Sequence, residues 1–314
     1  MIQDFDSELL KAKDSHSRLV KGSLALSDSG SKDCVNLPSP TAVSRIMPQL
    51  ALVTGASSGL GKALAQALAK QNVRLILVAR REELLKQLAK ELPVATEVHR
   101  IDLSNSDDRK RLIQLIHQKT PDLVINNAGF GLYGRTLSQP LRELEEMVDV
   151  NVQALIEITL ESARALQNAQ KKGTILNISS AAAFFSYPTF SLYAATKAFV
   201  NSFSVGLDAE LKSEGIRVLT ACPGQINTNF RKRASKNFTQ KKTHFSMTPE
   251  KAAALILEQI QKGKTLSIIG KGAQILVPLA RLLPKCLIHY ILKRGIRNRY
   301  QGPSVDTESQ GPSV

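Results

Sequence analysis

The 314-residue sequence predicts an α/β protein in which helices cover both faces of a doubly wound parallel sheet of about seven strands. Short, almost continuously apolar segments alternate with longer segments of helical period, a pattern typical of parallel strands buried on both faces. A glycine-rich turn follows the first apolar segment, and no run of eighteen uncharged apolar residues is present to cross a membrane. These observations predict a single, well-packed α/β domain.

The strands are expected where the apolar segments lie, at residues 50–54, 74–79, 96–101, 122–126, 174–179, 216–221 and 265–269. The intervening segments have the length of helices, and the first carries Leu60, Leu64 and Leu68 at helical spacing. Because a helical segment follows each strand, the strands are expected to run parallel. The predicted domain covers residues 47–272.

The segments outside this domain differ from it in composition. Residues 1–46 are rich in Ser, Asp and Lys, and they predict a disordered extension that the fold does not need. Residues 273–300 are apolar and basic, and they predict a helical segment. Residues 301–314 contain Gln-Gly-Pro-Ser-Val twice, which predicts a disordered tail.

The net charge of +15 is concentrated in two regions of the chain. Residues 230–242 and residues 281–300 each contain six Lys or Arg and no acidic residue. Such runs are typical either of solvated, flexible segments or of contacts with anionic partners. No nucleic-acid recognition motif accompanies them, so nucleic acid is not expected to be a partner.

Cysteine and histidine are sparse and scattered. The three cysteines, Cys34, Cys222 and Cys286, are far apart, and neither they nor the five histidines have the spacing of metal ligands. The sequence therefore predicts no metal site, no disulfide framework and a reducing compartment. The N-terminus lacks the basic-then-apolar order of a secretory signal, and we expect a cytoplasmic protein.

A glycine pattern lies between the first expected strand and the first expected helix, at Thr54-Gly55-Ala-Ser-Ser-Gly59-Leu-Gly61. Glycines allow the backbone to approach a pyrophosphate, and the helix N-terminus offers free N–H groups and a positive dipole end. This context predicts a Rossmann fold that binds a dinucleotide. The expected cofactor-binding residues of the turn are Thr54, Gly55, Ser57, Ser58, Gly59, Leu60 and Gly61.

The end of the second strand predicts which dinucleotide is bound. An NAD-preferring site usually has Asp or Glu there, whereas this chain has Ala79 followed by Arg80. An arginine can bind a 2′-phosphate with two hydrogen bonds, so Arg80 predicts NADP(H), with Arg81 or Lys62 as helpers. Further cofactor contacts are expected from Asp102 and Leu103 at the adenine edge and from the loop Asn127-Ala128-Gly129.

Tyr193 and Lys197 are four residues apart and therefore share a face of their expected helix. A cation close to a phenol favours the phenolate and lowers the phenol pKa from its usual value near ~10. Ser180 precedes Tyr193 by thirteen residues. Alone, the Tyr-x-x-x-Lys pair is a weak signal, because most such pairs lie on solvated helix surfaces.

The combination of these motifs resembles the short-chain dehydrogenase/reductase family. The chain contains Thr-Gly-x-x-x-Gly-x-Gly at 54–61, Asn-Asn-Ala-Gly at 126–129 and an asparagine at 151. Ser180, Tyr193-x-x-x-Lys197 and Pro223-Gly224 follow in that order. The resemblance covers residues 48–270, and the combination is specific although each motif is not.

The resemblance implies a role for each catalytic candidate. Tyr193 would be the general acid in reduction and the base in oxidation, and Lys197 would lower its pKa and bind the nicotinamide ribose. Ser180 would orient the substrate carbonyl, and Asn151 would hold a water that connects Lys197 to solvent. Pro223, Gly224, Ile226 and Thr228 would line the nicotinamide.

Two functions remain open. The first is an NADP(H)-dependent oxidoreductase that interconverts a carbonyl and an alcohol on an apolar, acyl or lipid-like small molecule, against a wall formed by Phe184, Phe185, Tyr187, Pro188 and Phe190. The second is a non-enzymatic NADP(H)-binding sensor or scaffold.

The resemblance implies that the basic segment after Thr228 forms a lid over the substrate. This segment either binds an anionic group or is solvated. Residues 275–300 either contact an anionic membrane peripherally or pack on protein. The resemblance also implies a homodimer or homotetramer through residues 141–168 and 190–212.

Overall fold

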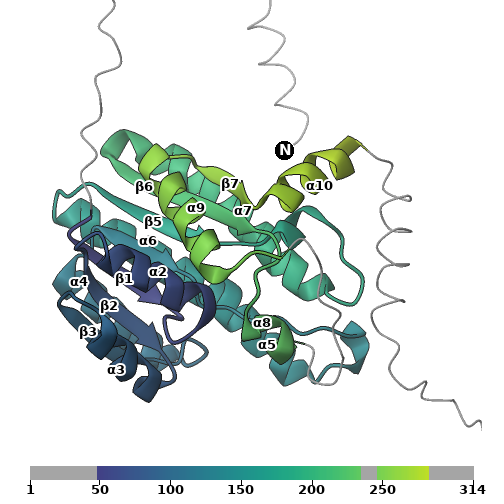
Figure 1. Ribbon diagram of the computed structural model, residues 1–314, viewed down its shortest axis with the longest axis horizontal. Helices are drawn as coiled ribbons and strands as arrows, with labels where there is room; N and C mark the ends of the chain where they lie inside the picture. The colour runs from purple at the N-terminus through teal and green to yellow at the C-terminus, as the bar shows by residue number, and fades with distance from the viewer. Residues whose placement is uncertain (1–47, 235–245, 283–314) are drawn as a thin grey trace, which may run out of the picture. The chain divides into compact units, whose positions relative to one another are not determined.

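The computed structural model describes residues 48–234 and 246–282 of the chain, which form a parallel sheet with helices on both faces (Figure 1). The strands that it describes are β1 (Leu50–Thr54), β2 (Arg74–Ala79), β3 (Thr96–Arg100), β4 (Leu123–Asn126), β5 (Gly173–Ile178), β6 (Ile216–Pro223) and β7 (Leu266–Ile269). Every pairing between them is parallel, and the order is β3-β2-β1-β4-β5-β6-β7. The predicted doubly wound, seven-stranded fold is confirmed.

Helices connect the strands. They are α2 (Gly59–Ala69), α3 (Glu82–Glu91), α4 (Ser106–Lys119), α5 (Leu141–Val148), α6 (Ala154–Asn168), α7 (Ser191–Leu211), α8 (Asn229–Ala234), α9 (Pro249–Lys262) and α10 (Lys271–Leu282). Short helical turns are η1 (Thr136–Ser138), η2 (Asp149–Gln153), η3 (Ala181–Phe184) and η4 (Lys212–Glu214). Residues 273–282 of the predicted C-terminal helical segment belong to α10. The predictions for residues 1–46, 283–300 and 301–314 lie outside the described residues.

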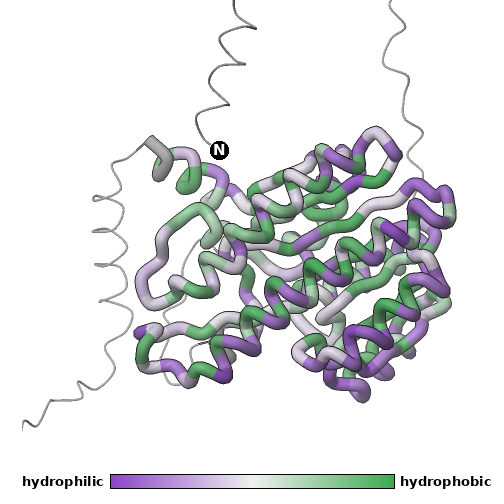
Figure 2. Tube along the Cα trace, turned by 180° about the vertical axis from the view of Figure 1, so that it is seen from behind, coloured by the Kyte–Doolittle hydropathy of each residue, from purple (hydrophilic) through white to green (hydrophobic). Residues whose placement is uncertain are grey.

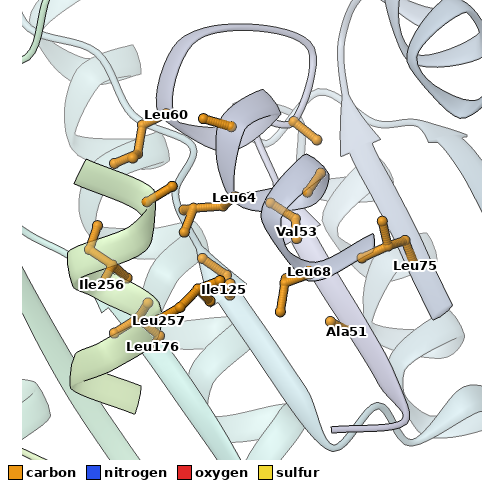
Figure 3. Close-up of a cluster of buried hydrophobic side chains, with 14 of the residues drawn as sticks. Ala51, Val53, Leu60, Leu64, Leu68, Leu75, Ile125, Leu176, Ile256 and Leu257 are labelled. Atoms are coloured by element: carbon orange, nitrogen blue, oxygen red, sulfur yellow. The ribbon is translucent and has the colours of Figure 1, made fainter. Parts of the chain in front are cut away.

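Alternation along the strands divides the core into two layers. In β1, Ala51 and Val53 belong to the layer under α2, α3 and α9, whereas Leu52 belongs to the layer under α4, α6 and α7. Figure 3 shows the first layer, where Leu64 and Leu68 of α2 lie between β1 and the side chain of Ile256 on α9. Hydrophobic and hydrophilic residues alternate along the outer helices in Figure 2, as expected for helices with one buried face.

Two asparagines inside the sheet share a chain of side-chain hydrogen bonds with α6 and α7. Asn126 Nδ2 donates to Asn177 Oδ1 at 2.9 Å and to Thr159 Oγ1 at 3.1 Å. Asn177 Nδ2 in turn donates to Ser204 Oγ at 2.9 Å. A buried amide left without partners would cost about 1–3 kcal/mol, so this chain of bonds fixes how β4 and β5 meet α6 and α7.

Candidate active site

The residues predicted for the site gather at one edge of the sheet. Strands β1 and β4 are neighbours although β2 and β3 lie between them in sequence, so the strand order reverses there. In open α/β sheets such a reversal leaves a crevice at the carboxyl ends of the strands. Thr54 ends β1, Asn126 ends β4, and Ser180 follows β5 by two residues.

The glycine turn requires glycine at specific positions. Gly55 and Gly59 have φ angles of 67° and 57°, in the left-handed region that favours glycine. A Cβ on Gly61 would lie 2.4 Å from the carbonyl oxygen of Gly55, so any side chain there would separate α2 from β1. These three positions are therefore determined by the backbone path of the turn.

Hydrogen bonds tie the glycine turn to the loop after β4. The backbone N–H groups of Asn127 and Ala128 both donate to Thr54 Oγ1 at 3.0 Å. Asn127 Nδ2 returns a bond to the carbonyl oxygen of Thr54 at 2.9 Å. The two predicted cofactor segments thus form one rigid unit.

Arg81 is the arginine that reaches the glycine turn. Its Nη2 donates to Ser57 Oγ at 2.9 Å and to Ser58 Oγ at 2.8 Å. The first turn of α2 contains no acidic residue, and its N-cap Ser58 makes no side-chain capping bond. The helix N-terminus and an arginine are therefore both directed to the place where an anionic group of a dinucleotide would bind, and these residues fit an NAD(P) cofactor.

Arg80, the residue predicted to bind the 2′-phosphate, is turned toward acids instead. Its Nη1 lies 3.2 Å from Glu146 Oε1 on α5 and 3.8 Å from Asp102 Oδ2. Lys62, a predicted helper, pairs with Glu91 at 3.2 Å. The sequence held no signal for the partner Glu146, because 66 residues separate it from Arg80.

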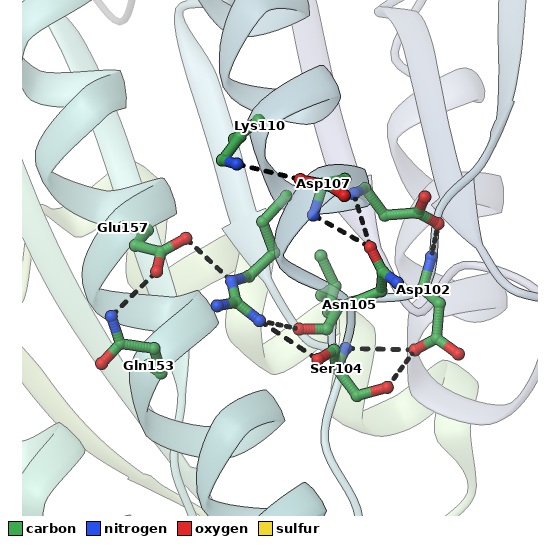
Figure 4. A network of polar contacts seen from close by, with 10 residues as sticks. Asp102, Ser104, Asn105, Asp107, Lys110, Gln153 and Glu157 are labelled. Carbon is green, nitrogen blue, oxygen red and sulfur yellow. Dashed lines mark hydrogen bonds and ion pairs between the residues drawn. The ribbon is translucent and has the colours of Figure 1, made fainter.

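The predicted adenine-edge residues differ in orientation. The Asp102 carboxylate accepts hydrogen bonds from the backbone and hydroxyl of Ser104, at 3.1 and 2.8 Å (Figure 4). The side chains of Leu103 and Leu60 are buried in the hydrophobic core. Only the backbone of these two leucines is left to meet a cofactor.

A partly buried ion pair that the sequence analysis missed anchors the same loop. Arg109 on α4 donates through Nε to Glu157 Oε2 on α6 at 2.8 Å. Its Nη1 also donates to the carbonyl oxygen of Leu103 at 3.1 Å. Figure 4 shows Glu157 linked in turn to Gln153. Nothing in the local sequence distinguishes Arg109 from the other charged residues of α4.

Tyr193 is buried at the N-terminal end of α7, with 7% of its surface exposed. Burial raises the pKa of its phenol well above the usual value, and a hydrogen bond with Ser180 lowers it less strongly. The nearby phenol of Tyr133 adds a further increase to the pKa. Tyr193 therefore keeps its proton at neutral pH in this structure.

Lys197 lies one turn further along α7 and is also buried. Its Nζ donates to the carbonyl oxygen of Ile178 at 2.9 Å and lies 5.8 Å from the centroid of the Tyr193 ring. Burial lowers the pKa of Lys197 to about 8. Desolvation by burial is the largest influence on both groups, and it raises the pKa of Tyr193 while it lowers that of Lys197.

Asn151 lies in a π-helical turn, η2, between α5 and α6. Its Oδ1 accepts from the backbone N–H of Phe130 at 3.1 Å, and its Nδ2 donates to the Phe130 carbonyl at 2.9 Å. Nδ2 also donates to Thr196 Oγ1 at 3.2 Å. A Cβ on Gly129 would lie 2.9 Å from Asn151 Oδ1 and 3.4 Å from Lys197 Nζ, so the loop brings these two groups together.

The two serines after β5 have separate partners. Ser179 Oγ is buried and donates to the carbonyl oxygen of Lys197 at 2.9 Å. Ser180 faces Tyr193 and also accepts the backbone N–H of Ala182 at 3.1 Å. Ser180 is thus the serine positioned beside the phenol, as the thirteen-residue spacing predicts.

Aromatic rings surround Tyr193. Phe190 stacks between Tyr133 and Tyr193, with centroid distances of 3.9 and 4.2 Å. Phe230 on α8 lies 5.6 Å from the Tyr193 ring, and the Tyr133 N–H donates to the carbonyl of Ala234 at 2.8 Å. Tyr133 and Phe230 thus join Phe190 around the phenol, and sequence reasoning missed them because they come from other segments of the chain.

The segment predicted to line the nicotinamide follows β6. The N–H of Gly224 donates to the carbonyl oxygen of Ile269 at 2.9 Å, and Ile226 forms a bridge with Met247. A Cβ on Gly59 would lie 3.2 Å from Thr228 Cγ2, so this loop returns to the glycine turn. Pro223 is the last residue of β6 and is buried.

The family comparison agrees with this arrangement. The pattern of the short chain dehydrogenase family matches residues 49–238. A serine 3-dehydrogenase of Rhizobium radiobacter is 35% identical over 182 residues, which are 57% of this chain and 72% of that protein. An uncharacterized oxidoreductase of Staphylococcus aureus (strain USA300) is 30% identical over 223 residues, 70% of this chain and 94% of that protein.

A solved structure shows the same fold. A short-chain dehydrogenase from Sphingobium yanoikuyae in complex with NADPH has a TM-score of 0.66 and 26% identity. The match covers 84% of this chain and 98% of that one. The chain belongs to the short-chain dehydrogenase family, and it is an oxidoreductase of that family.

Proposed function

We propose that this protein is an NADP(H)-dependent oxidoreductase that interconverts a carbonyl and an alcohol, with Tyr193 as the general acid and base. The observation that carries the proposal is the convergence of Ser180, Tyr193, Lys197 and Asn151 at the strand-order reversal. A bound nicotinamide would exchange the hydride. The protein would contribute position, proton transfer and a site from which water is excluded.

The proton transfer can be derived from the buried groups. The phenol of Tyr193 is protonated in this structure, so it carries the proton that would pass to the carbonyl oxygen during reduction. Ser180, which bonds the phenol, would also hold the substrate oxygen. Lys197, with a pKa of about 8, would return the proton to Tyr193 near neutral pH, and Asn151 would connect Lys197 to solvent through a water.

The variant Tyr193→Phe tests the proposal against a protein that binds NADPH without turnover. General acid catalysis contributes about 10²–10⁴-fold, so the variant is expected to lose NADPH oxidation by at least that factor. NADPH binding should persist. The chain contains no tryptophan, so the fluorescence of directly excited NADPH measures that binding without energy transfer from an indole ring. Turnover in Tyr193→Phe equal to that of the wild type would contradict the mechanism.

We further propose NADP(H) in preference to NAD(H). Arg81, which follows β2, donates hydrogen bonds to two serines of the glycine turn, and β2 ends without an acid. The variant Arg81→Ala is expected to lower the ratio of kcat/KM for NADPH over NADH by about tenfold or more, since a lost charged hydrogen bond is worth about 1.5–3 kcal/mol. Arg80→Ala should change the ratio less, because Glu146 and Asp102 hold that side chain. Arg74→Ala, at the opposite end of β2, is the matched control.

An apolar carbonyl compound is the proposed substrate, since the rings of Phe190, Tyr133 and Phe230 surround the phenol. A screen of ketones, aldehydes and acyl thioesters with NADPH tests this class.

We propose a cytoplasmic protein that forms a homodimer or homotetramer through residues 141–168 and 190–212. The exposed Phe199 and Val205 of α7 support such a contact. Light scattering on the purified protein measures the oligomeric state.

A further inference from the structure

Helix α10 presents an apolar face to solvent. Ile275, Leu276 and Leu279 are 70%, 55% and 50% exposed, whereas Val277 is 2% exposed and faces the protein. The hydrophobic turns of α10 appear green in Figure 2. Val277 therefore fixes which side of the helix is turned outward. Exposing three large apolar side chains on one short helix is unfavourable in water, and such a face marks an interaction surface.

This face lies beside the candidate active site. Helix α10 follows β7 at the carboxyl edge of the sheet and contacts η3, which directly follows Ser180 (Figure 1). Gln274 Nε2 donates to the carbonyl oxygen of Ile268 at 2.9 Å. A Cβ on Gly224 would lie 3.0 Å from that of Ala273, so α10 also packs on the proposed nicotinamide loop. A partner surface bound to α10 would therefore lie next to the substrate side of the candidate active site.

The charge of the surrounding sequence selects the partner. Between Glu258 and Asp306 the chain contains no Asp or Glu. From the start of α10 onward it carries the basic residues Lys271, Arg281, Lys285, Lys293, Arg294, Arg297 and Arg299. The chain after β6, which leads into α8 at the same edge of the sheet, has no acid between Glu214 and Glu250. An apolar face in a stretch of sequence that carries cations and no acid complements an anionic lipid surface.

A second copy of the chain fits this face less well. A symmetric dimer through α10 would bring two acid-free basic segments together, and like charges repel. Among the helices described in the structure, none is long and apolar enough to cross a membrane, and Pro278 lies inside α10. The geometry is that of a helix that lies in the plane of a lipid interface.

We propose that α10 docks this protein on an anionic membrane. The carboxyl edge of the sheet, which holds the candidate active site, is thereby turned toward the lipid. The substrate is then an apolar carbonyl compound dissolved in the bilayer, such as a long-chain ketone or aldehyde. This last statement rests on the proposed carbonyl chemistry, whereas the docking itself does not.

Co-sedimentation of the full-length protein with vesicles tests the docking. Binding is expected to vesicles that contain phosphatidylglycerol and not to vesicles of phosphatidylcholine alone, and high salt should weaken it. The triple variant Ile275→Glu, Leu276→Glu, Leu279→Glu should bind at least about tenfold more weakly. Leu84→Glu on α3 is the matched control, because Leu84 is also an exposed leucine and lies on a different helix. It should bind like the wild type.

Three results would overturn the docking. They are no binding to anionic vesicles, equal binding by the triple variant, or an altered oligomeric state of the triple variant with unchanged vesicle binding. Turnover of a water-soluble ketone in the absence of vesicles provides a separate check, and it should be the same in the triple variant and the wild type. Loss of that turnover in both proteins would refute the proposed function and leave the docking result intact.

A kinetic comparison tests the substrate class. A long-chain ketone carried in anionic vesicles should be reduced with a kcat/KM at least about tenfold lower by the triple variant than by the wild type. The soluble ketone should show no such difference. Equal rates on the vesicle-borne ketone would contradict delivery of substrate from the membrane.

Discussion

The floor and the rim of the candidate site are held in place by different forces. The floor consists of the glycine turn 54–61 with Asn151, Ser180, Tyr193 and Lys197, and close backbone approaches and buried hydrogen bonds determine its geometry. The rim consists of Phe230 of α8 and the rings around Tyr193, which are held by apolar contacts, and Phe230 is partly exposed. A single added methyl group should therefore damage the floor, whereas the rim should tolerate apolar exchanges that alter the choice of substrate.

The largest effect is expected in the floor, from Gly61→Ala. The new Cβ would lie 2.4 Å from the Gly55 carbonyl oxygen and 2.5 Å from Asn127 Nδ2, so the turn must open. We expect loss of NADPH binding and a free energy of unfolding lowered by about 1–3 kcal/mol, measured by urea denaturation.

A matched change in a helix should have the opposite sign. A Cβ on Gly206 in α7 would meet nothing within 4 Å. Gly206→Ala should therefore raise the free energy of unfolding by about 0.5–1 kcal/mol, because glycine is a poor helix former. If both variants changed the stability in the same direction, close packing at Gly61 would not be the cause.

The second prediction concerns the charge of Lys197. Burial lowers its pKa to about 8, whereas an unfolded lysine has a pKa near ~10.4. Between these values the unfolded chain binds a proton that the folded chain does not, so the free energy of unfolding rises as the pH increases. Lys197→Met should remove this rise, which is on the order of 1–3 kcal/mol between pH about 8 and about 10. Parallel pH profiles from urea denaturation of the two proteins would refute the pKa shift.

The third prediction lies where floor and rim meet. A Cβ on Gly131 would lie 2.7 Å from the ring of Phe190 and 2.9 Å from that of Tyr193. Gly131→Ala should shift the stacked rings and lower kcat/KM by about tenfold, since small displacements of a reacting group are costly. NADPH affinity should stay unchanged, because the glycine turn is not touched. A change in cofactor affinity equal to that in kcat/KM would show that the floor had moved as well.

The smallest effect is expected in the rim, from Phe230→Leu. The ring of Phe230 is tilted by 55° against Tyr193 and only partly buried. The exchange should raise KM for apolar ketones by a few-fold, about 1 kcal/mol of lost contact, and leave NADPH affinity and thermal stability unchanged. Steady-state kinetics on a series of ketones measures it. A large fall in kcat at saturating substrate would place Phe230 among the groups that position the phenol.

Most of the fold could be predicted from local patterns. The predicted strand at 216–221 is two residues shorter than β6, and the other strand ends agree within one residue. Apolar runs predict these strands well, because parallel strands buried on both faces need apolar side chains at nearly every position. The ends are less certain, since Cys222 and Pro223 extend β6 through bonds to β7 that no local pattern reveals.

The site could be predicted in part. Tyr193 and Lys197 are four residues apart on one helix and Ser180 follows the end of a strand, so their proximity follows from helical spacing and from the topology of the sheet. The partner of Arg80 could not be predicted, because Glu146 reaches it from α5, far away in the sequence. The same holds for Tyr133, whose ring stacks on Phe190, and for Phe230 of α8, whose ring lies beside Tyr193, because both come from segments far from α7 in the sequence.

The sequence by itself determined the parallel sheet, the glycine turn and the order of the catalytic residues, because these depend on local period, spacing and backbone conformation. Tertiary structure alone decided which arginine lies on the glycine turn, that burial governs the pKa values of Tyr193 and Lys197, and that α10 exposes its apolar face beside the site. Each of these depends on desolvation or on contacts between segments far apart in the chain. The physical reason is that burial and long-range pairing are properties of the packed chain, which no local run of residues contains.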